Sequence, residues 1–364
     1  MQIDQIINFL ELQAPTFLQE SYDNAGLLTG KREWDCTGAI ISLDTTEEVI
    51  LEAVKYGYNL VISHHPIIFS GLKKINGKNY VERAIIAAIK NDIAIYAIHT
   101  NLDNVLTGVN SAIADKLGLV NRQILQSKEN ILRKLVVFVP EDAAAEVRQA
   151  IFDAGGGHIG KYSECSFNSQ GKGTFKPEEG TDPYVGKIGV QHQADEFRVE
   201  IIYPQWLQAT IIQAMLVAHP YEEVAYDITN MLNHHQSTGS GLMGEIEGME
   251  EDEFLRLVKS QFGLKAMKHT GLLGKKINNV AVCGGAGSFL IRHAITAGAD
   301  IFITSDIKYH EFFDADDRMV ILDIGHYESE QFTIDLLYNK IHQKFPTFAV
   351  RKTEVNTNPV HYFM

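Results

Sequence analysis

The chain has 364 residues, which is long for one hydrophobic core and indicates two or three domains. Its 45% hydrophobic and 21% charged residues are ordinary for a soluble globular protein, and its formal net charge of -14 argues against broad, non-specific binding to nucleic acid, which depends on Lys and Arg. The three cysteines are scattered without a CxxC motif, which disfavours a disulfide framework and a zinc-thiolate site and fits a reducing cytoplasm.

The N-terminal half begins with an amphipathic pattern over residues 1–20, which predicts a helix ending near Pro15. This N-terminal stretch has no basic segment followed by an apolar core, and no apolar run in the sequence reaches transmembrane length. We therefore expect a cytoplasmic protein with no membrane partner. From Gly38 onward, apolar strands alternate with helices, which indicates βαβ units and a largely parallel sheet. The expected strands are 38–44, 59–66 and 93–101, and the expected helices are 46–56, 80–91 and 109–117.

The character of the chain changes near Asn130. Residues 131–230 read approximately as βαββαβ, the order of a ferredoxin-like unit. The expected strands there are 132–140, 185–191, 197–203 and 222–228, with one more before Pro183, and the expected helices are 141–157 and 205–219. A polar linker at 233–241 follows, and the α/β rhythm then returns, with one strand expected at 264–269. The chain ends with an expected helix over 329–345 and a strand over 347–355.

Two adjacent histidines, His64 and His65, follow an apolar run of strand type and precede Pro66. Neighbouring side chains on a regular strand point to opposite faces, so both rings can reach one site only where the strand ends and the chain turns. One interpretation is a core histidine beside an exposed one. The other is a metal site, because imidazole is the commonest metal ligand. This stretch alone leaves both open.

Two further clusters of metal-ligating residues also lie at predicted strand ends. The three clusters together contain four imidazoles and two carboxylates: His64 and His65, His99 and Asp103, and His326 and Glu330. These donors exceed the needs of one four-coordinate metal, whereas two divalent metals about 3.5 to 4 Å apart, bridged by a carboxylate, would use them all. Nitrogen and oxygen ligands admit Zn, Fe, Mn or Co.

The positions of these clusters also predict the domain organisation. Ligands between residues 64 and 103 must meet those at 326 and 330, so the flanking segments form one unit and the middle is an insertion. We therefore predict an α/β protein in which two α/β portions, 1–129 and 236–364, form one discontinuous dimetal-binding unit. Residues 130–235 would form an inserted ferredoxin-like α+β domain.

Two other stretches are candidates for chemistry. Residues 283–288, CGGAGS, precede an expected helix and are read as a plain turn or as a minor contributor to substrate binding, since they lack the Walker lysine pattern. The run SDIKYHEFF offers Asp306, Lys308, Tyr309, His310 and Glu311, which could act as general acid or base or bind an anionic substrate. The same run also fits a solvated helix start capped by Ser305 or Asp306, and the sequence does not decide between these readings.

Several motifs together resemble one known family. SHHPIIF, IHTNLDN, GSGLMGEI, VCGGAGS, SDIKYHE and DIGHYESE are similar to motifs of the Nif-three-like proteins, often called GTP cyclohydrolase I type 2 homologs. The resemblance covers about 125 residues at each end, and the middle segment resembles the PII-like or CutA-like insert of the longer bacterial members. The sequence departs from the family at Ser305, where glycine is usual before the aspartate of this motif.

The resemblance implies a site, an assembly and an activity. It implies that two divalent metals are bound by His64, His65, Asp103, His326 and Glu330. It adds His99 as a sixth ligand. It also implies a toroidal homo-hexamer whose sites face an internal cavity. The family label implies GTP ring opening, which no residue in this sequence supports independently.

The first functional hypothesis is a metal-dependent hydrolase acting on a small phosphorylated or nucleotide-like substrate whose identity the sequence does not give. Tyr309, Lys308 or His310 would protonate a leaving group or hold an anion. The alternative is a non-catalytic metal-binding regulatory or scaffold protein that uses the insert as a sensor or interaction module.

Overall fold

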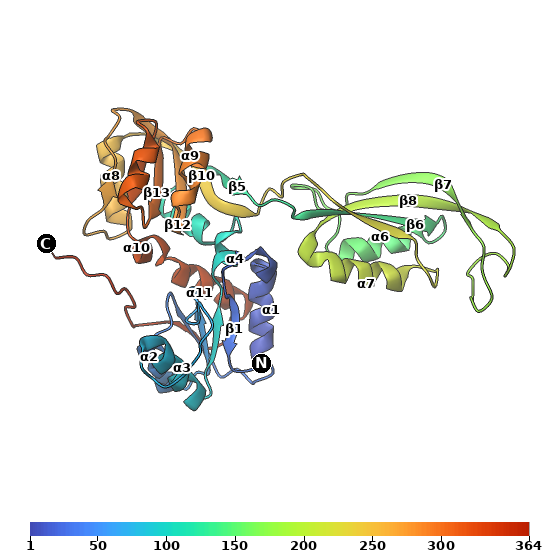
Figure 1. Cartoon of the computed structure of the whole chain (residues 1–364), viewed down its shortest axis with the longest axis horizontal. Coiled ribbons are helices and arrows are strands. Elements are labelled where there is room, and N and C mark those ends of the chain that lie inside the picture. Colours follow the sequence, from blue (N-terminus) through green and yellow to red (C-terminus); the bar gives the residue numbers. More distant parts are fainter. Residues whose placement is uncertain (364) are drawn as a thin grey trace. The chain divides into compact units, whose positions relative to one another are not determined.

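The computed structural model describes residues 1–363 and divides into two compact units, each described here by itself. The first unit is discontinuous and comprises Met1–Ser127 and Ser237–Met364, and the second comprises Lys128–Gln236 (Figure 1). The boundaries predicted from the sequence lie one or two residues from these. No helix within residues 1–363 is long and apolar enough to cross a membrane.

The N-terminal sheet of the first unit has five strands in the order β1-β4-β3-β2-β15. Four of them run parallel, and β1 pairs antiparallel with β4 at one edge. The strands are β1 (Gly26–Thr29), β2 (Ala39–Ser42), β3 (Leu60–Ser63), β4 (Ala94–Ala97) and β15 (Val350–Lys352). β2, β3 and β4 are buried along their whole length, as expected of parallel strands covered on both faces.

Helices cover both faces of this sheet (Figure 1). The pair α2 (Glu47–Tyr56) and α3 (Tyr80–Lys90) packs on one face, and α1 (Ile3–Gln13) lies on the other. Thr46 caps the start of α2 by accepting a hydrogen bond from the backbone N–H of Val49. The other helices of this half are α4 (Thr100–Asp103) and α5 (Val109–Leu117), with a 3₁₀ turn at Thr16–Leu18.

The second sheet of the first unit is mixed, with the strand order β11-β14-β13-β12-β10-β5. Its centre is parallel, from β12 through β13 to β14, and its outer pairings are antiparallel. The strands are β5 (Val120–Ser127), β10 (Gly239–Glu250), β11 (Lys268–His269), β12 (Lys276–Ala286), β13 (Ile301–Ser305) and β14 (Val320–Asp323). The helices are α8 (Glu251–Gln261), α9 (Ile291–Thr296), α10 (His326–Glu330) and α11 (Thr333–Lys344), with 3₁₀ turns η3 (Ser288–Leu290) and η4 (Tyr309–Ala315).

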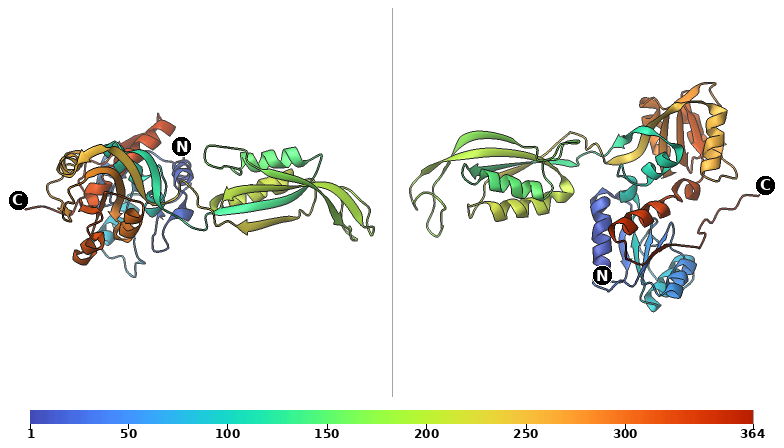
Figure 2. Two further views of the ribbon diagram at one scale, coloured as in Figure 1. Left: turned by 90° about the horizontal axis from the view of Figure 1, so that it is seen from above. Right: turned by 180° about the vertical axis from the view of Figure 1, so that it is seen from behind.

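The second unit has the element order βαββαβ, with the strands arranged β7-β8-β6-β9 and all pairings antiparallel. Its elements are β6 (Leu132–Pro140), α6 (Ala144–Asp153), β7 (Phe167–Phe175), β8 (His192–Pro204), η2 (Gln205–Leu207), α7 (Gln208–Ala218) and β9 (Tyr226–Asn230). Both helices lie on one face of the sheet (Figures 1 and 2), where a core of its own forms around Val137, Ile151 and Ile211.

Three expectations about secondary structure differ from the structure. The strand predicted at 185–191 is wrong: this stretch is an irregular loop in which Gly186 and Gly189 have φ of 94° and 78°. The predicted final helix is two helices, α10 and α11, and the strand predicted at 264–269 shrinks to β11. β1 and β5 were not predicted, because neither shows the apolar alternation of a buried strand.

Candidate metal centre

The clusters predicted from the sequence meet where strands of the two sheets end within the first unit. His64 and His65 follow β3 directly, His99 follows β4, and α10 begins at His326 three residues after β14. Parallel neighbours end at the same edge of a sheet, which is where α/β proteins place their ligand sites. The ring centroid of His65 lies 5.0 Å from that of His64, 5.4 Å from that of His99 and 5.2 Å from that of His326.

The first half of the centre is formed by His64, Asp103 and Glu330. The His64 ring is fully buried, and its Nδ1–H donates to the backbone oxygen of Ile98 at 2.8 Å. Its Nε2 lies 3.6 Å from Asp103 Oδ1 and 3.8 Å from Glu330 Oε1. Both His64 Nε2 and Asp103 Oδ1 are buried without a hydrogen-bond partner, which is costly unless a further group binds there.

The second half of the centre is formed by His65, His326 and the other oxygen of Glu330. Glu330 Oε2 lies 2.9 Å from His65 Nε2 and 3.1 Å from His326 Nε2, and the two Nε2 atoms are 3.3 Å apart. The two carboxylate oxygens of Glu330 thus face different sets of donors, although the side chain itself is almost fully buried. The four-residue spacing of His326 and Glu330 places both on one face of α10, as predicted.

Carboxylates orient three of the four imidazoles. His65 Nδ1 is 2.8 Å from Asp44, His99 Nδ1 is 2.8 Å from Asp23, and His326 Nδ1 is 2.6 Å from Asp306. A donor bond from Nδ1 fixes the ring orientation and turns Nε2 toward the centre, as at carboxylate–histidine–metal sites.

None of these three aspartates was predicted to orient a metal ligand, and Asp44 was not predicted as part of the site at all. Asp44 and Asp306 each follow a strand directly or within two residues, so they meet the same strand-end criterion as the histidines. Asp23 precedes β1 in a polar turn and offers no such signal. Asp306 also has φ of 57°, a conformation that aspartate tolerates better than most residues do.

The surroundings of the site shift the protonation of its groups. Burial lowers the pKa of His65, but hydrogen bonds to Asp44 and Glu330 outweigh this and raise it to about 10. Burial has the same opposing effect at His326, where hydrogen bonding to Glu330 prevails and raises the pKa to about 9. Burial, reinforced by the charge of Glu330, raises the pKa of Asp103 to about 7. Burial raises the pKa of Glu330, but the hydrogen bonds from His326 and His65 and the nearby imidazole of His64 outweigh this and hold it well below its usual range.

The glycine-rich stretch at residues 283–288 makes room for Glu330. A Cβ atom added at Gly285 would lie 2.4 Å from Glu330 Oε1, and Gly285 has φ of 65°. Its backbone N–H is held by Ser329 Oγ at 3.0 Å. Gly284 and Gly285 therefore pack against the side chain of Glu330, which accounts for these two glycines without a phosphate.

Lys308, Tyr309 and His310 lie at the start of η4 with exposed side chains. The Tyr309 ring contacts those of His310 and Phe313, at 5.1 and 5.7 Å between centroids. The backbone N–H of Lys308 donates to Glu311 at 2.8 Å. From this run, Asp306 is the residue in contact with the centre, through His326.

The donor set fits divalent metal ions. Three groups of side chains each bring their ligand atoms within 4.8 Å of one another: His64, His65 and His99; His65, His326 and Glu330; and His64, Asp103 and Glu330. Imidazole nitrogens mixed with carboxylate oxygens are ligands for Zn, Fe, Mn and Co. The unpartnered His64 Nε2 and Asp103 Oδ1 are the atoms that such an ion would satisfy.

Known proteins resemble this chain along nearly its whole length. The family model Duf34/NIF3 (NGG1p interacting factor 3) matches residues 1–359. A relative from Halalkalibacterium halodurans called GTP cyclohydrolase 1 type 2 homolog is 42% identical over 324 residues, which cover 88% of this chain and 87% of the relative. A Bacillus subtilis relative of the same name is 38% identical over 328 residues, covering 89% of this chain and 87% of the relative. The crystal structure of a Bacillus cereus protein related to NIF3 covers 100% of this chain and 99% of its own, with 38% identity and a TM-score of 0.87.

Proposed function

The chain belongs to the Duf34/NIF3 family, and we propose that it binds two divalent metal ions and uses them to hydrolyse a small phosphorylated or nucleotide-like substrate. The observation that supports this most strongly is the burial of His64 Nε2 and Asp103 Oδ1 without partners, facing Glu330 and the other imidazoles. A purely structural cluster would pair such atoms within the protein.

The proposed ligands divide into two sets that share Glu330. His64, Asp103 and Glu330 Oε1 would hold one ion, and His65, His326 and Glu330 Oε2 would hold the other. Glu330 is the proposed bridge because its two oxygens face the two sets separately. His99 groups with His64 and His65, so we propose it as a further ligand between the two sets.

A pair of divalent ions supplies Lewis acidity, which polarises the bond to be cleaved and makes water a stronger nucleophile at neutral pH. The chain's own residues orient the site. Asp44, Asp23 and Asp306 hold the Nδ1 protons of three imidazoles, and the backbone oxygen of Ile98 holds the fourth. Six side chains shared between two ions leave coordination positions open, which favours chemistry over a closed structural site.

The exposed residues Lys308, Tyr309 and His310 are proposed to bind an anionic part of the substrate or to protonate a leaving group. Asp306, two residues before Lys308, hydrogen-bonds His326, so η4 starts close in sequence to the centre. GTP is one candidate substrate, because relatives carry the name GTP cyclohydrolase 1 type 2 homolog.

A second candidate function is regulatory and rests on the insert. Residues 128–236 form a compact unit with its own core, and we propose that it is a PII-like or CutA-like module that senses a ligand or contacts a partner. The metals would then be structural or a signal. We further propose that the chain assembles as a homo-hexamer, as its resemblance to the family implies.

The test is to load purified protein with Zn, Fe, Mn or Co, to count the bound metal, and to assay a panel of nucleotides and phosphoesters that includes GTP. The Glu330→Gln variant is the control. Two ions per chain in the parent and metal-dependent turnover that the variant lacks would support the hydrolase. Two ions with no turnover above the variant would refute hydrolysis and leave the regulatory candidate.

A further inference from the structure

The second unit contains a cavity of about 880 Å³ that lies far along the sequence from every residue of the metal centre. It is lined by residues from β6, β7, β8 and the loops at 176–185 and 221–225. The lining includes four aromatic rings: Phe138, Phe175, Tyr184 and Tyr221. Its size is that of a small-molecule site.

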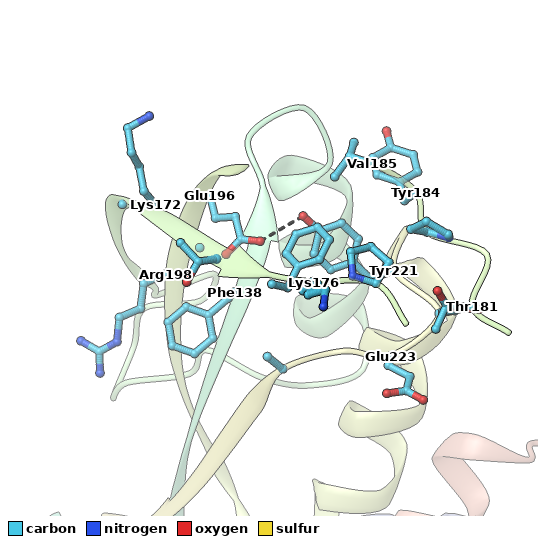
Figure 3. A pocket seen from close by; sticks show the side chains of 18 of the residues that line it. Phe138, Lys172, Lys176, Thr181, Tyr184, Val185, Glu196, Arg198, Tyr221 and Glu223 are labelled. Atoms are coloured by element: carbon cyan, nitrogen blue, oxygen red, sulfur yellow. Dashed lines mark hydrogen bonds between the residues drawn. The ribbon is translucent and has the colours of Figure 1, made fainter. Parts of the chain in front are cut away.

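A buried carboxylate, Glu196, faces this cavity. Glu196 is only 7% exposed and accepts a hydrogen bond from the Tyr221 hydroxyl at 3.0 Å (Figure 3). Burial, reinforced by the bond to Glu196, raises the pKa of Tyr221, so its hydroxyl stays a donor. Over residues 1–363, no lysine or arginine forms an ion pair with Glu196. A buried carboxylate without a cation is expensive unless something else compensates it.

The cations that line the cavity are already paired elsewhere. Lys172 lies 2.6 Å from Asp195, and Arg198 lies 2.6 Å from Glu200. Figure 3 shows both side chains extending away from the rings of Phe138 and Tyr221. Lys176 lies 3.8 Å from Glu178. Each of these lining cations therefore has a carboxylate partner other than Glu196.

The chain keeps space for Glu196 and fixes the rings around it. A Cβ at Gly173 would lie 2.2 Å from Glu196 Oε2, so this strand position has to be glycine for the carboxylate to lie there. His219, 6% exposed, accepts from the Tyr221 backbone N–H at 3.1 Å and donates to the Phe138 backbone oxygen at 3.0 Å. One neutral imidazole thus holds the backbone of two aromatic residues.

The rings are arranged as in a cage. The centroid of Tyr221 lies 5.8 Å from that of Phe175 and 6.1 Å from that of Tyr184, with the ring planes inclined at 60° and 53°. Inclined aromatic faces around one negative charge attract a cation through both the ring quadrupoles and the carboxylate. We infer that this cavity binds a small organic ammonium ion, with Glu196 as the counter-ion and the rings of Phe175, Tyr184 and Tyr221 against its alkyl groups.

Calorimetric titration of the full-length protein tests this with three probes: choline, its uncharged isostere 3,3-dimethylbutan-1-ol, and inorganic phosphate. We expect choline to bind at least about tenfold more tightly than the isostere, and phosphate not to bind in the insert. This comparison uses only the unmodified protein, so it does not depend on how any variant folds. Equal binding of choline and the isostere, or no binding of choline, would overturn the proposal.

Two variants locate the site. Glu196→Gln keeps the shape and can still accept from Tyr221, and it should weaken choline binding at least about tenfold while the isostere is unaffected. Glu146→Gln makes the same charge change at an exposed position of α6 outside the cavity and should leave choline binding unchanged. Choline binding that survives in Glu196→Gln, or that falls equally in both variants, would contradict the assignment to this cavity.

Discussion

At the scale of single residues, the candidate metal centre is shaped by the hydrogen bonds that its proposed ligands make with the surrounding protein. Each of the four imidazoles donates from Nδ1 to a fixed acceptor, and each therefore presents Nε2 to the centre. An imidazole without such a hydrogen bond could rotate, and its Nε2 would no longer be held toward the centre. The orienting aspartates should therefore matter for metal affinity although they bind no metal.

Asp44→Ala tests this dependence. It removes the acceptor for His65 Nδ1 at 2.8 Å, so we expect metal affinity to fall by about 10- to 100-fold while the fold is retained. Competition with a chromophoric chelator measures the affinity. Asp335→Ala, which removes a surface partner of Lys352, is the matched control and should leave it unchanged. Equal affinity in both variants would show that the ligands need no such support.

Metal binding should release protons. In the metal-free protein the pKa values of His65 and His326 are raised to about 10 and about 9, so both rings carry a proton at pH 7 and must lose it to bind a metal. Because protons compete with the metal, apparent affinity should rise as the pH increases toward 9. Calorimetry in buffers of different ionisation enthalpy counts the protons. A binding constant independent of pH between 6 and 9 would contradict these protonation states.

At the scale of secondary-structure elements, the candidate site is formed by residues that follow the ends of strands. β3 and β4 of one sheet and β14 of the other deliver His64, His65, His99 and, through α10, His326. β12 and α10 approach each other so closely that position 285 requires glycine. A side chain there would occupy the space of Glu330 Oε1.

Gly285→Ala should displace Glu330. Its Cβ would lie 2.4 Å from Oε1, so we expect loss of metal binding in addition to the cost of about 1 to 2 kcal/mol for alanine in a left-handed conformation. Gly263→Ala is the matched control, since Gly263 also has φ of 65° but its Cβ would meet nothing within 4 Å. Urea denaturation and metal counting on both variants separate the two effects. Full metal content in Gly285→Ala would contradict the packing argument.

The bounds of helices and strands can be predicted well from the sequence where local signals agree with the tertiary structure. α5 begins and ends at Val109 and Leu117 as expected, and β6 matches the expected 132–140, because apolar periodicity and burial coincide there. Residues 185–191 carry a strand-like composition, yet two glycines at positive φ turn them into a loop. Asp44 was missed, and the contact of Asp23 with His99 was not predicted, because a hydrogen bond to a distant imidazole leaves no periodic trace in the sequence.

At the scale of the whole molecule, all candidate metal ligands belong to the discontinuous unit, and the insert interrupts it between β5 and β10. Ser127 and Gly239 face each other as partners in the antiparallel pairing of these strands. The insert therefore leaves and re-enters the first unit at neighbouring positions, which makes its removal geometrically simple.

Replacing residues 128–238, which comprise the insert together with Ser237 and Thr238 of the first unit, by an Asn-Gly turn should give a folded protein with unchanged metal stoichiometry. A two-residue turn suits antiparallel strands in register, and Ser127 and Gly239 are in register. Elemental analysis and circular dichroism check the product, and choline binding should be absent from it. Loss of metal from a product that keeps its secondary structure would show that the insert is needed for the centre.

The proposed metal pair places one divalent ion on each side of Glu330. Crystals of the metal-loaded protein, with diffraction data collected above and below the absorption edge of the metal, test it most directly. We expect two anomalous peaks about 3.5 to 4 Å apart, one beside His64 and Asp103 and the other beside His65 and His326. A single peak, or peaks away from Glu330 in fully loaded protein, would contradict the account.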